Sequence, residues 1–339
     1  MLNYKYIVFN SNDNNALKKN PDGYYTICLN DLEDMKDVQI VSQPLEHMPL
    51  WIRFIYSVYS SRRISRIIKL PKSIWYPLYF RVEKAIDKPY CFVFMNPYIS
   101  NGYYAYLKKK YPNCKIVAVH RDLVRVWMEL APHFIQNPMY DLEYIFDEKE
   151  ASKYGMEYFH EFESKIELGD TSSFPVSDVF FAGKAKDRLP RLLEAYRIFN
   201  DHGLKCLFYI TDVPHEQREE LPGIVYADKN MNYREMLSYS NNAKCLLEIN
   251  QKEAVGLTSR FLESVMYNKI LITDNVEIEK SKFYNPSYIQ CINDISDIDP
   301  SIINNSDDVN YNYNDEFSPK HLICQIDAKL SEEGAKNQS

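Results

Sequence analysis

Short apolar runs alternate with longer segments of mixed polarity along the first half of the chain. These runs are rich in Val, Ile, Phe and Tyr, and they lie at 6–9, 38–41, 90–95, 115–119 and 143–146. Between them the pattern predicts helical segments over 50–82, 102–111 and 147–154, the last with Asp147 as its N-cap. Near-continuous apolar strands that alternate with helices are typical of a parallel sheet covered on both faces. The first half therefore predicts an open, doubly wound α/β sheet.

A second alternating series follows in the rest of the chain. Its expected strands lie at 178–182, 207–210, 224–226, 244–249 and 270–275. Helices are expected at 189–199, where leucines and aromatics form one stripe, at 233–241, and from about 258. Residues after 300 are rich in Asn and Asp, so we expect a loop there, followed by a short helix over 319–330.

The small, polar stretch 169–175 ends in proline and is the best candidate for a linker. A chain of 339 residues exceeds one typical core and fits two domains. We expect one domain at 1–168, a second at 176–300, and a loop with a terminal helix at 301–339. The carboxyl ends of both sheets should face a central cleft, where ligands bind in such folds.

Composition and charge narrow the class of protein. Residues 1–165 carry 22 basic and 19 acidic side chains, for a net charge of +3, and the remainder carries −10. An acidic second half argues against nucleic acid as the main partner. The seven cysteines are scattered singly, and the sequence shows neither a signal peptide nor a membrane-spanning apolar run. These features favour a cytoplasmic protein with reduced thiols.

The first motif that suggests chemistry joins an expected strand to an expected helix at 181–188. Gly183 permits close approach of a ligand to the backbone, and three cations follow it: Lys184, Lys186 and Arg188. Cations beside exposed N–H groups suit a diphosphate. The alternative is an ordinary strand–helix turn with solvated lysines, since the loop lacks the full glycine fingerprint of dinucleotide-binding proteins.

The second motif, Glu253-Ala-Val-Gly-Leu-Thr-Ser-Arg-Phe-Leu-Glu263, lies between two expected strands. A loop that enters a helix at the carboxyl end of a strand favours anion binding. The residues at the helix start are Gly256, Leu257, Thr258, Ser259 and Arg260, with Glu263 one turn further on. Together with the first motif they would form a two-sided diphosphate clamp. The alternative is simple capping of the helix, with a surface ion pair between Arg260 and Glu263 worth about 0.3 kcal/mol.

A candidate base follows the expected strand 115–119. Asp122 or His120 is a side chain of the type that accepts a proton from a substrate hydroxyl. The alternative is that Asp122 caps the helix 123–130 and that His120 is a partly buried strand-end residue. Asp13, in the polar loop after the first strand, is the rival base.

The segment 51–82 holds seven basic residues, no acidic one, and many interleaved aromatic and aliphatic side chains. This pattern is typical of docking to a membrane surface. The alternative is an outer helix whose aromatics enter the core while its arginines stay solvated. The sequence shows no metal-ligand cluster and no suitably placed Asp-x-Asp, so neither a metal nor another cofactor is expected.

The second half resembles a known family. The segments that carry the resemblance lie at 223–226, 232–237, 243–248, 253–256, 261–266 and 269–273. Over 178–293 their order is similar to the donor-binding domain of GT-B glycosyltransferases, especially those of bacterial capsule and lipopolysaccharide biosynthesis. The segment 143–155 also resembles the end of the acceptor-binding domain of that family. The resemblance implies a GT-B fold with two Rossmann-like domains, acceptor-binding at 1–168 and donor-binding at 176–300.

The resemblance also implies roles for single residues. Residues 183–188 and 258–260 would hold the diphosphate, Glu263 would accept hydrogen bonds from the ribose hydroxyls, and the stretch 226–233, which ends at Tyr233, would lie near the base. The sequence departs from the family at one point. The family's two glutamates are separated by seven residues, whereas nine separate Glu253 from Glu263. Glu263 matches the second glutamate of the family.

The expected activity is therefore metal-independent transfer of a hexosyl group. The donor would be a nucleotide-diphosphate sugar, a UDP-sugar first of all, which acts as co-substrate. The acceptor would be a hydroxyl of a glycan or lipid-linked glycan in surface-polysaccharide or lipopolysaccharide synthesis, at the inner face of the membrane. A sugar-nucleotide epimerase of the same fold and a non-catalytic partner subunit are the alternatives.

Overall fold

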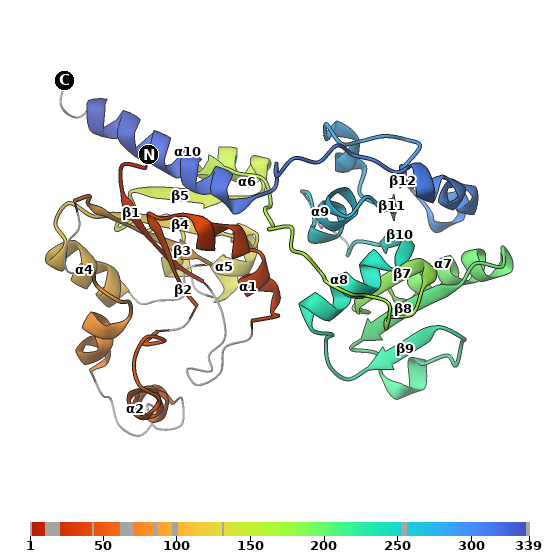
Figure 1. Cartoon of the computed structure of the whole chain (residues 1–339), viewed down its shortest axis with the longest axis horizontal. Helices are drawn as coiled ribbons and strands as arrows, with labels where there is room; N and C mark the ends of the chain where they lie inside the picture. The colour runs from red at the N-terminus through yellow and green to blue at the C-terminus, as the bar shows by residue number, and fades with distance from the viewer. Residues whose placement is uncertain are drawn as a thin grey trace. The chain divides into compact units, whose positions relative to one another are not determined.

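The chain forms two compact α/β units (Figure 1). The computed structural model describes residues 2–10, 21–42, 44–61, 71–83, 87–96, 101–130, 132–251 and 256–336. The first unit consists of Met1–Pro21, Tyr25–His160 and Ser318–Ser339, and the second of Asp22–Tyr24 and Glu161–Phe317. The linker expected at 169–175 lies inside the second unit, and the expected 301–339 tail is divided between the two units.

The first unit is built on six parallel strands in the order β2-β1-β3-β4-β5-β6. The strands are β1 (Lys5–Phe9), β2 (Val38–Val41), β3 (Tyr90–Met95), β4 (Lys115–His120), β5 (Leu142–Ile145) and β6 (Glu157–Tyr158). Val8 of β1 lies opposite Ile40 on one side and Val93 on the other. Every residue of β3 is buried, as expected for a sheet covered on both faces.

Helices and 3-10 turns connect these strands. They are α1 (Tyr24–Ile27), η1 (Asn30–Asp34), α2 (Leu50–Ser60), η2 (Lys72–Leu78), α4 (Asn101–Lys110), α5 (Val124–Leu130), η3 (Pro132–Phe134), α6 (Glu148–Tyr154) and α10 (Pro319–Lys336). The predicted cap of α6 is confirmed, because the Asp147 side chain accepts a hydrogen bond from the Glu150 backbone N–H. Gly155, with φ of 66°, ends the same helix in the left-handed region.

The helix α10 belongs to the first unit, although it follows the whole of the second unit in sequence. Its Asp327 accepts hydrogen bonds from the backbone N–H of Asn3 at 2.8 Å and from the Tyr6 hydroxyl at 2.9 Å. The side chain of Ser318, just before α10, donates to Asp31 at 2.6 Å. These hydrogen bonds therefore attach the start of the first unit to a helix that lies more than 300 residues further along the chain.

The second unit contains six parallel strands in the order β12-β11-β10-β7-β8-β9. The strands are β7 (Ser177–Lys184), β8 (Cys206–Thr211), β9 (Ile224–Ala227), β10 (Ala243–Glu248), β11 (Ile270–Thr273) and β12 (Ile289–Cys291). Its helices and 3-10 turns are α7 (Leu189–Asp201), η4 (His215–Gln217), α8 (Tyr233–Asn241), α9 (Ser259–Met266), η5 (Val276–Lys280), η6 (Ile295–Asp297) and η7 (Pro300–Asp308). The first strand, β7, has β8 and β9 on one side and β10 to β12 on the other. This is the doubly wound order in which ligands bind where the strand order reverses, here between β7 and β10.

Some predicted boundaries differ from the observed ones. The strands β6 and β12 are absent from the predicted pattern, and the stretch from 300 to 308 forms η7 instead of a loop. The helix predicted over 50–82 is resolved in part as α2 and η2, and 62–70 lies outside the described residues. No helix among the described residues is both long and apolar enough to cross a membrane.

Candidate functional site

The carboxyl ends of β7 and β10 form the edge of the second sheet at which the two predicted motifs meet. β7 ends at Lys184 and leads through three residues into Arg188, the N-cap of α7. β10 ends at Glu248, and its connection reaches Thr258, the N-cap of α9. Two helix N-termini thus follow adjacent strands at the switch point, an arrangement that favours an anion. We call this region the switch-point edge.

Arg188 ties the two strands of this edge together. Its Nε and Nη2 donate to the Lys184 carbonyl at 3.1 and 3.0 Å, and its Nη1 donates to the Ile249 carbonyl after β10. Gly183 makes room for this, since a Cβ at that position would lie 3.0 Å from Arg188 Nη2. Burial lowers the pKa of Arg188, and the nearby positive charge of Arg260 lowers it further. Two cations held this close favour an anion beside them.

The two lysines of the first motif lie exposed at the same edge. Lys184 forms an exposed ion pair with Asp212 at 3.0 Å. Lys186 has a positive φ of 45°, and its Nζ donates to Gln251 Oε1 at 2.9 Å in the connection that follows β10. Lys186 therefore links the first motif to the connection that leads from β10 into the second motif.

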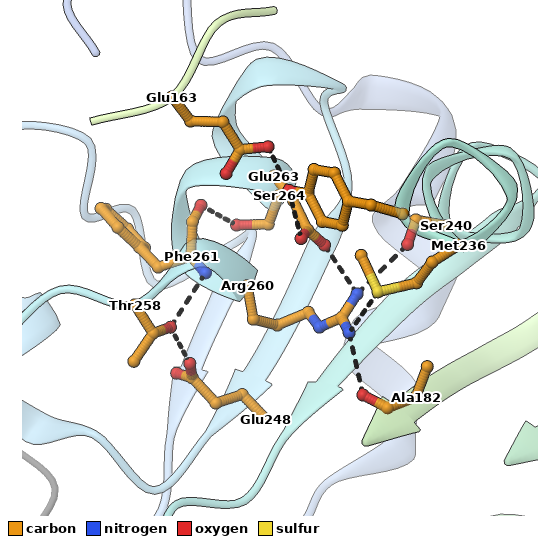
Figure 2. A network of polar contacts seen from close by, with 11 residues as sticks. Glu163, Ala182, Met236, Ser240, Glu248, Thr258, Arg260, Phe261, Glu263 and Ser264 are labelled. Carbon is orange, nitrogen blue, oxygen red and sulfur yellow. Dashed lines mark hydrogen bonds and ion pairs between the residues drawn. The ribbon is translucent and has the colours of Figure 1, made fainter. Parts of the chain in front are cut away.

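Arg260 is the centre of a largely buried polar network (Figure 2). It donates to Glu263 Oε2 at 2.6 Å, to Ser240 Oγ at 3.1 Å and to the Ala182 carbonyl at 3.2 Å. The side chains of Arg260 and Glu263 are 11% and 1% exposed, so their ion pair is not the surface pair considered from the sequence. The guanidinium connects α9 with α8 and with β7.

Glu263 lies in the interior with both oxygens engaged. Oε2 accepts from Arg260, and Oε1 lies 3.0 Å from the Tyr233 hydroxyl. The same hydroxyl lies within hydrogen-bond distance of Glu163 Oε1. A tyrosine hydroxyl has one proton to donate, so Tyr233 can donate to only one of these carboxylates at a time. Burial raises the pKa of Glu263, and Arg260 opposes that rise. Tyr233 at the start of α8 and Glu263 within α9, both candidate donor-site residues, are thus brought together.

Glu248 is a site residue that the sequence analysis missed. It is buried at the end of β10, where its Oε1 accepts from Thr258 Oγ1 and its Oε2 accepts from Thr273 Oγ1 at 2.5 Å. Thr258 also caps α9, because its side chain accepts from the Phe261 backbone N–H at 3.3 Å. Burial raises the pKa of Glu248. An acidic residue at the end of an apolar strand is the signal that could have indicated it.

The remaining residues of the second motif lie at the same entrance to α9. The Gly256 carbonyl accepts a hydrogen bond from Asn275 Nδ2 at 2.8 Å, and Gly256 has φ of 79°. Leu257 packs against the core of the second unit, and Ser259 is the first residue of α9. Glu253 lies outside the described residues. The backbone of this motif is therefore fixed from 256 onward by groups on β10 and just after β11.

The candidate bases belong to the first unit. His120, at the end of β4, is buried, and its Nε2 lies 2.6 Å from Glu143 Oε1. Asp122 is exposed, and its Oδ2 accepts from Asn96 Nδ2 at 3.3 Å. Partial burial of its carboxyl raises the pKa of Asp122, which is a property of general bases. Of these two residues, Asp122 is the one that solvent or a substrate can reach.

The sequence left open that Asp122 caps the helix that follows it, but Glu150 accepts a hydrogen bond from the start of that helix, α5. The Val124 backbone N–H, at the start of α5, donates to Glu150 Oε2 at 2.7 Å. Asp13 lies outside the described residues. Among the residues that the structure describes, no group of three or more His, Cys, Asp or Glu side chains is arranged to hold a metal ion.

Comparison with known proteins bears on the fold. The sequence matches no family model and no curated protein. The structure is similar to an alpha-glucosyltransferase (AGT) in complex with UDP, with a TM-score of 0.52 and 10% identity over 95% of this chain and 98% of that one. The fold is GT-B.

Two further similarities are weaker. Trehalose-6-phosphate synthase OtsA matches with a TM-score of 0.48 and 11% identity over 96% of this chain and 95% of that chain. A chain of the glycosylation-associated Gap123 complex from Streptococcus agalactiae matches with a TM-score of 0.42 and 8% identity over 82% of this chain. This GT-B chain spans 59% of the length of that Gap123 chain. The strand orders of the two sheets confirm the predicted α/β class with two Rossmann-like sheets.

Proposed function

We propose that this GT-B protein is a glycosyltransferase that binds a UDP-sugar at the switch-point edge of its second unit. The observation that supports the proposal best is the set of four cations at this edge. Arg188 and Arg260 are fixed by backbone carbonyls, while Lys184 and Lys186 lie exposed beside them. A diphosphate would bring the negative charge that such cations and two helix N-termini stabilise.

The same groups give the edge a role in catalysis. When the bond between sugar and diphosphate breaks, negative charge develops on the leaving diphosphate. Cations held in place before the reaction stabilise that charge without reorganisation, which is the most effective form of electrostatic catalysis. No step of the proposal uses a metal ion. Arg260 holds α9 against α8 and β7 through Ser240 and the Ala182 carbonyl, and Glu263 would reach the ribose after exchanging one of its present partners.

The acceptor in this proposal is a hydroxyl of a glycan or lipid-linked glycan in bacterial surface-polysaccharide or lipopolysaccharide synthesis. Asp122 would accept the proton of that hydroxyl, because the residue is exposed while partial burial of its carboxyl raises its pKa. His120 would act as a positioning residue through its contact with Glu143. Asp13 remains the rival base.

The test is a donor screen with UDP-, GDP- and TDP-hexoses. We expect UDP-sugars to raise the melting temperature and to release UDP faster when a bacterial membrane extract supplies the acceptor. Chelation of divalent metal should leave this rate unchanged. If no donor either binds or is cleaved, the transferase proposal is wrong.

The products distinguish the alternative activities. An epimerase would convert the UDP-sugar into its epimer without any acceptor, which nuclear magnetic resonance of the sugar detects. A non-catalytic subunit would bind no donor or would bind one without turnover. A Lys186→Ala variant should weaken UDP binding, whereas Lys280→Ala, at an exposed ion pair elsewhere on the second unit, should not.

A further inference from the structure

The helix α2 carries apolar side chains on two faces. Ile52 and Tyr56 face the core of the first unit, and the rings of Tyr56 and Tyr59 lie 5.3 and 5.5 Å from that of Trp75. A second stripe, spaced i, i+3, i+4 and i+7, consists of Trp51, Phe54, Ile55 and Val58. These four side chains are 65%, 58%, 48% and 42% exposed. We call them the outer stripe of α2.

The outer stripe is not explained by the packing of the unit. A helix on the surface of a globular protein needs one apolar stripe, which faces the core, and its other face is normally polar. Although the structure describes every residue of α2, none of them is fully buried. The helix lies at the margin of the first unit, away from the sheet (Figure 1). Contiguous exposed apolar side chains of this kind mark an interaction surface.

The charge around the outer stripe indicates what it binds. The sequence from Leu50 to Val82 holds seven basic residues and no acidic one, in a chain whose net charge is −7. Among the described residues of this stretch, Lys72 and Arg81 are exposed. An apolar stripe in a stretch of sequence that is rich in cations matches a bilayer with anionic headgroups, in which the side chains enter the acyl boundary and the cations meet the lipid charge. A symmetric contact with a second copy would instead bring like charges together.

We propose that the outer stripe of α2 docks the protein onto an anionic lipid bilayer. The inference does not depend on the transferase proposal, because all its residues belong to the first unit and none to the switch-point edge. It also resolves the two alternatives for the segment 51–82. The aromatics of η2, such as Tyr76, are buried, as the core alternative requires, while Trp51 and Phe54 on α2 face outward, as docking requires.

The first test is co-sedimentation with vesicles of phosphatidylcholine alone or with phosphatidylglycerol. We expect binding to the anionic vesicles, weakened by salt. Trp51→Ser and Phe54→Ser should each reduce the partition coefficient about tenfold or more, as expected for loss of a buried aromatic. Lys72→Gln and Arg81→Gln should each reduce it about fivefold on anionic vesicles. The matched control is Val276→Ser, which removes a side chain that is 47% exposed on the second unit and should change nothing.

The second test follows the tryptophan itself. Lipids brominated in their acyl chains should quench the fluorescence of the wild-type protein, and Trp51→Phe should abolish this quenching. Trp75 and Trp127 are half-buried in the first unit and serve as internal controls. Thermal melting checks that each variant is folded.

Either of two results would overturn the proposal. One is that the wild-type protein does not bind vesicles, or that folded variants of the outer stripe bind them as well as the wild type does. The other is a dimer in the absence of lipid, seen by light scattering, that Trp51→Ser converts to monomer while no vesicle binding occurs. The outer stripe would then be a contact between copies of the chain.

Discussion

Replacing Arg260 by methionine tests whether the ion pair with Glu263 supports the second unit. Arg260→Met keeps the unbranched, apolar stem of the side chain but removes the guanidinium, whose central carbon lies 5.8 Å from the centroid of the Phe180 ring. It removes the guanidinium's hydrogen bonds, which include a contact with the Met236 sulfur, and leaves a carboxylate that is 1% exposed without its cation. Removing one partner of a buried pair costs about 3–5 kcal/mol, because the remaining charge stays desolvated. We expect a loss of that size in the free energy of unfolding at neutral pH.

The pH dependence of this loss in unfolding free energy shows whether the buried charge of Glu263 causes it. Burial raises the pKa of Glu263 in the folded protein, and Arg260 opposes the rise. A carboxyl with a raised folded-state pKa favours folding at low pH, and this stabilisation is lost as pH rises from its unfolded pKa through its folded one. Arg260→Met removes the opposing cation, so its destabilisation should grow with pH and shrink in mild acid. Arg260→Met combined with Glu263→Met should recover much of the loss, since no charge is then left buried.

The assay is urea unfolding followed by far-ultraviolet circular dichroism and by tryptophan fluorescence. All three tryptophans lie in the first unit, so the part of the dichroism transition that fluorescence does not report belongs to the second unit. The control is Arg197→Met, which breaks an exposed pair with Glu219 at 2.6 Å and should cost about 0–1 kcal/mol. A loss below 1 kcal/mol for Arg260→Met, without pH dependence, would refute the reasoning.

The other predictions concern the proposed site. Lys186→Ala should weaken UDP binding about tenfold in isothermal titration, the loss of one charge-assisted contact, and equal binding by the variant would remove Lys186 from the site. Gly183→Ala places a Cβ 3.0 Å from Arg188 Nη2, so we expect a loss of about 1–3 kcal/mol in thermal unfolding; an unchanged melting temperature would contradict the close approach. Asp122→Asn should lower kcat by about 10²–10⁴ and leave UDP affinity intact. Because burial raises the pKa of Asp122, wild-type activity should rise with pH through that pKa, and this acid limb should vanish in the variant; an unchanged profile would exclude Asp122 as the base.

The strands were predictable because the core of a parallel sheet leaves a strong local signal. The run Cys245-Leu-Leu is fully buried in β10, and the cap at Asp147 depends on its own helix alone. The two-residue strand β6 has no such signal, since Glu157 and Tyr158 become a strand only through pairing with β5. The sequence pattern was sufficient to predict an element where residues within that element determine its structure.

The sequence predicts where the candidate site lies on the second sheet, but it does not predict the contacts and burial of the side chains there. The sequence indicates that the two loops share one sheet edge, and the structure brings Lys186 and Gln251 into contact there. The spacing of Arg260 and Glu263 predicts a pair but not its burial, because the partners that enclose it, Ala182 and Ser240, come from β7 and α8. Glu248 was missed for the same reason: its hydroxyl partners lie 10 and 25 residues away.

The return of α10 to the first unit has a consequence for synthesis of the chain. A ribosome releases the whole of 161–317 before it releases α10, so the second unit can fold while the first is still incomplete. The hydrogen bonds from Asn3 and Tyr6 can form only after Asp327 has been synthesised. The first unit is therefore begun before the second unit but completed after it. A nascent chain halted before α10 would leave the first sheet exposed where this helix contacts it.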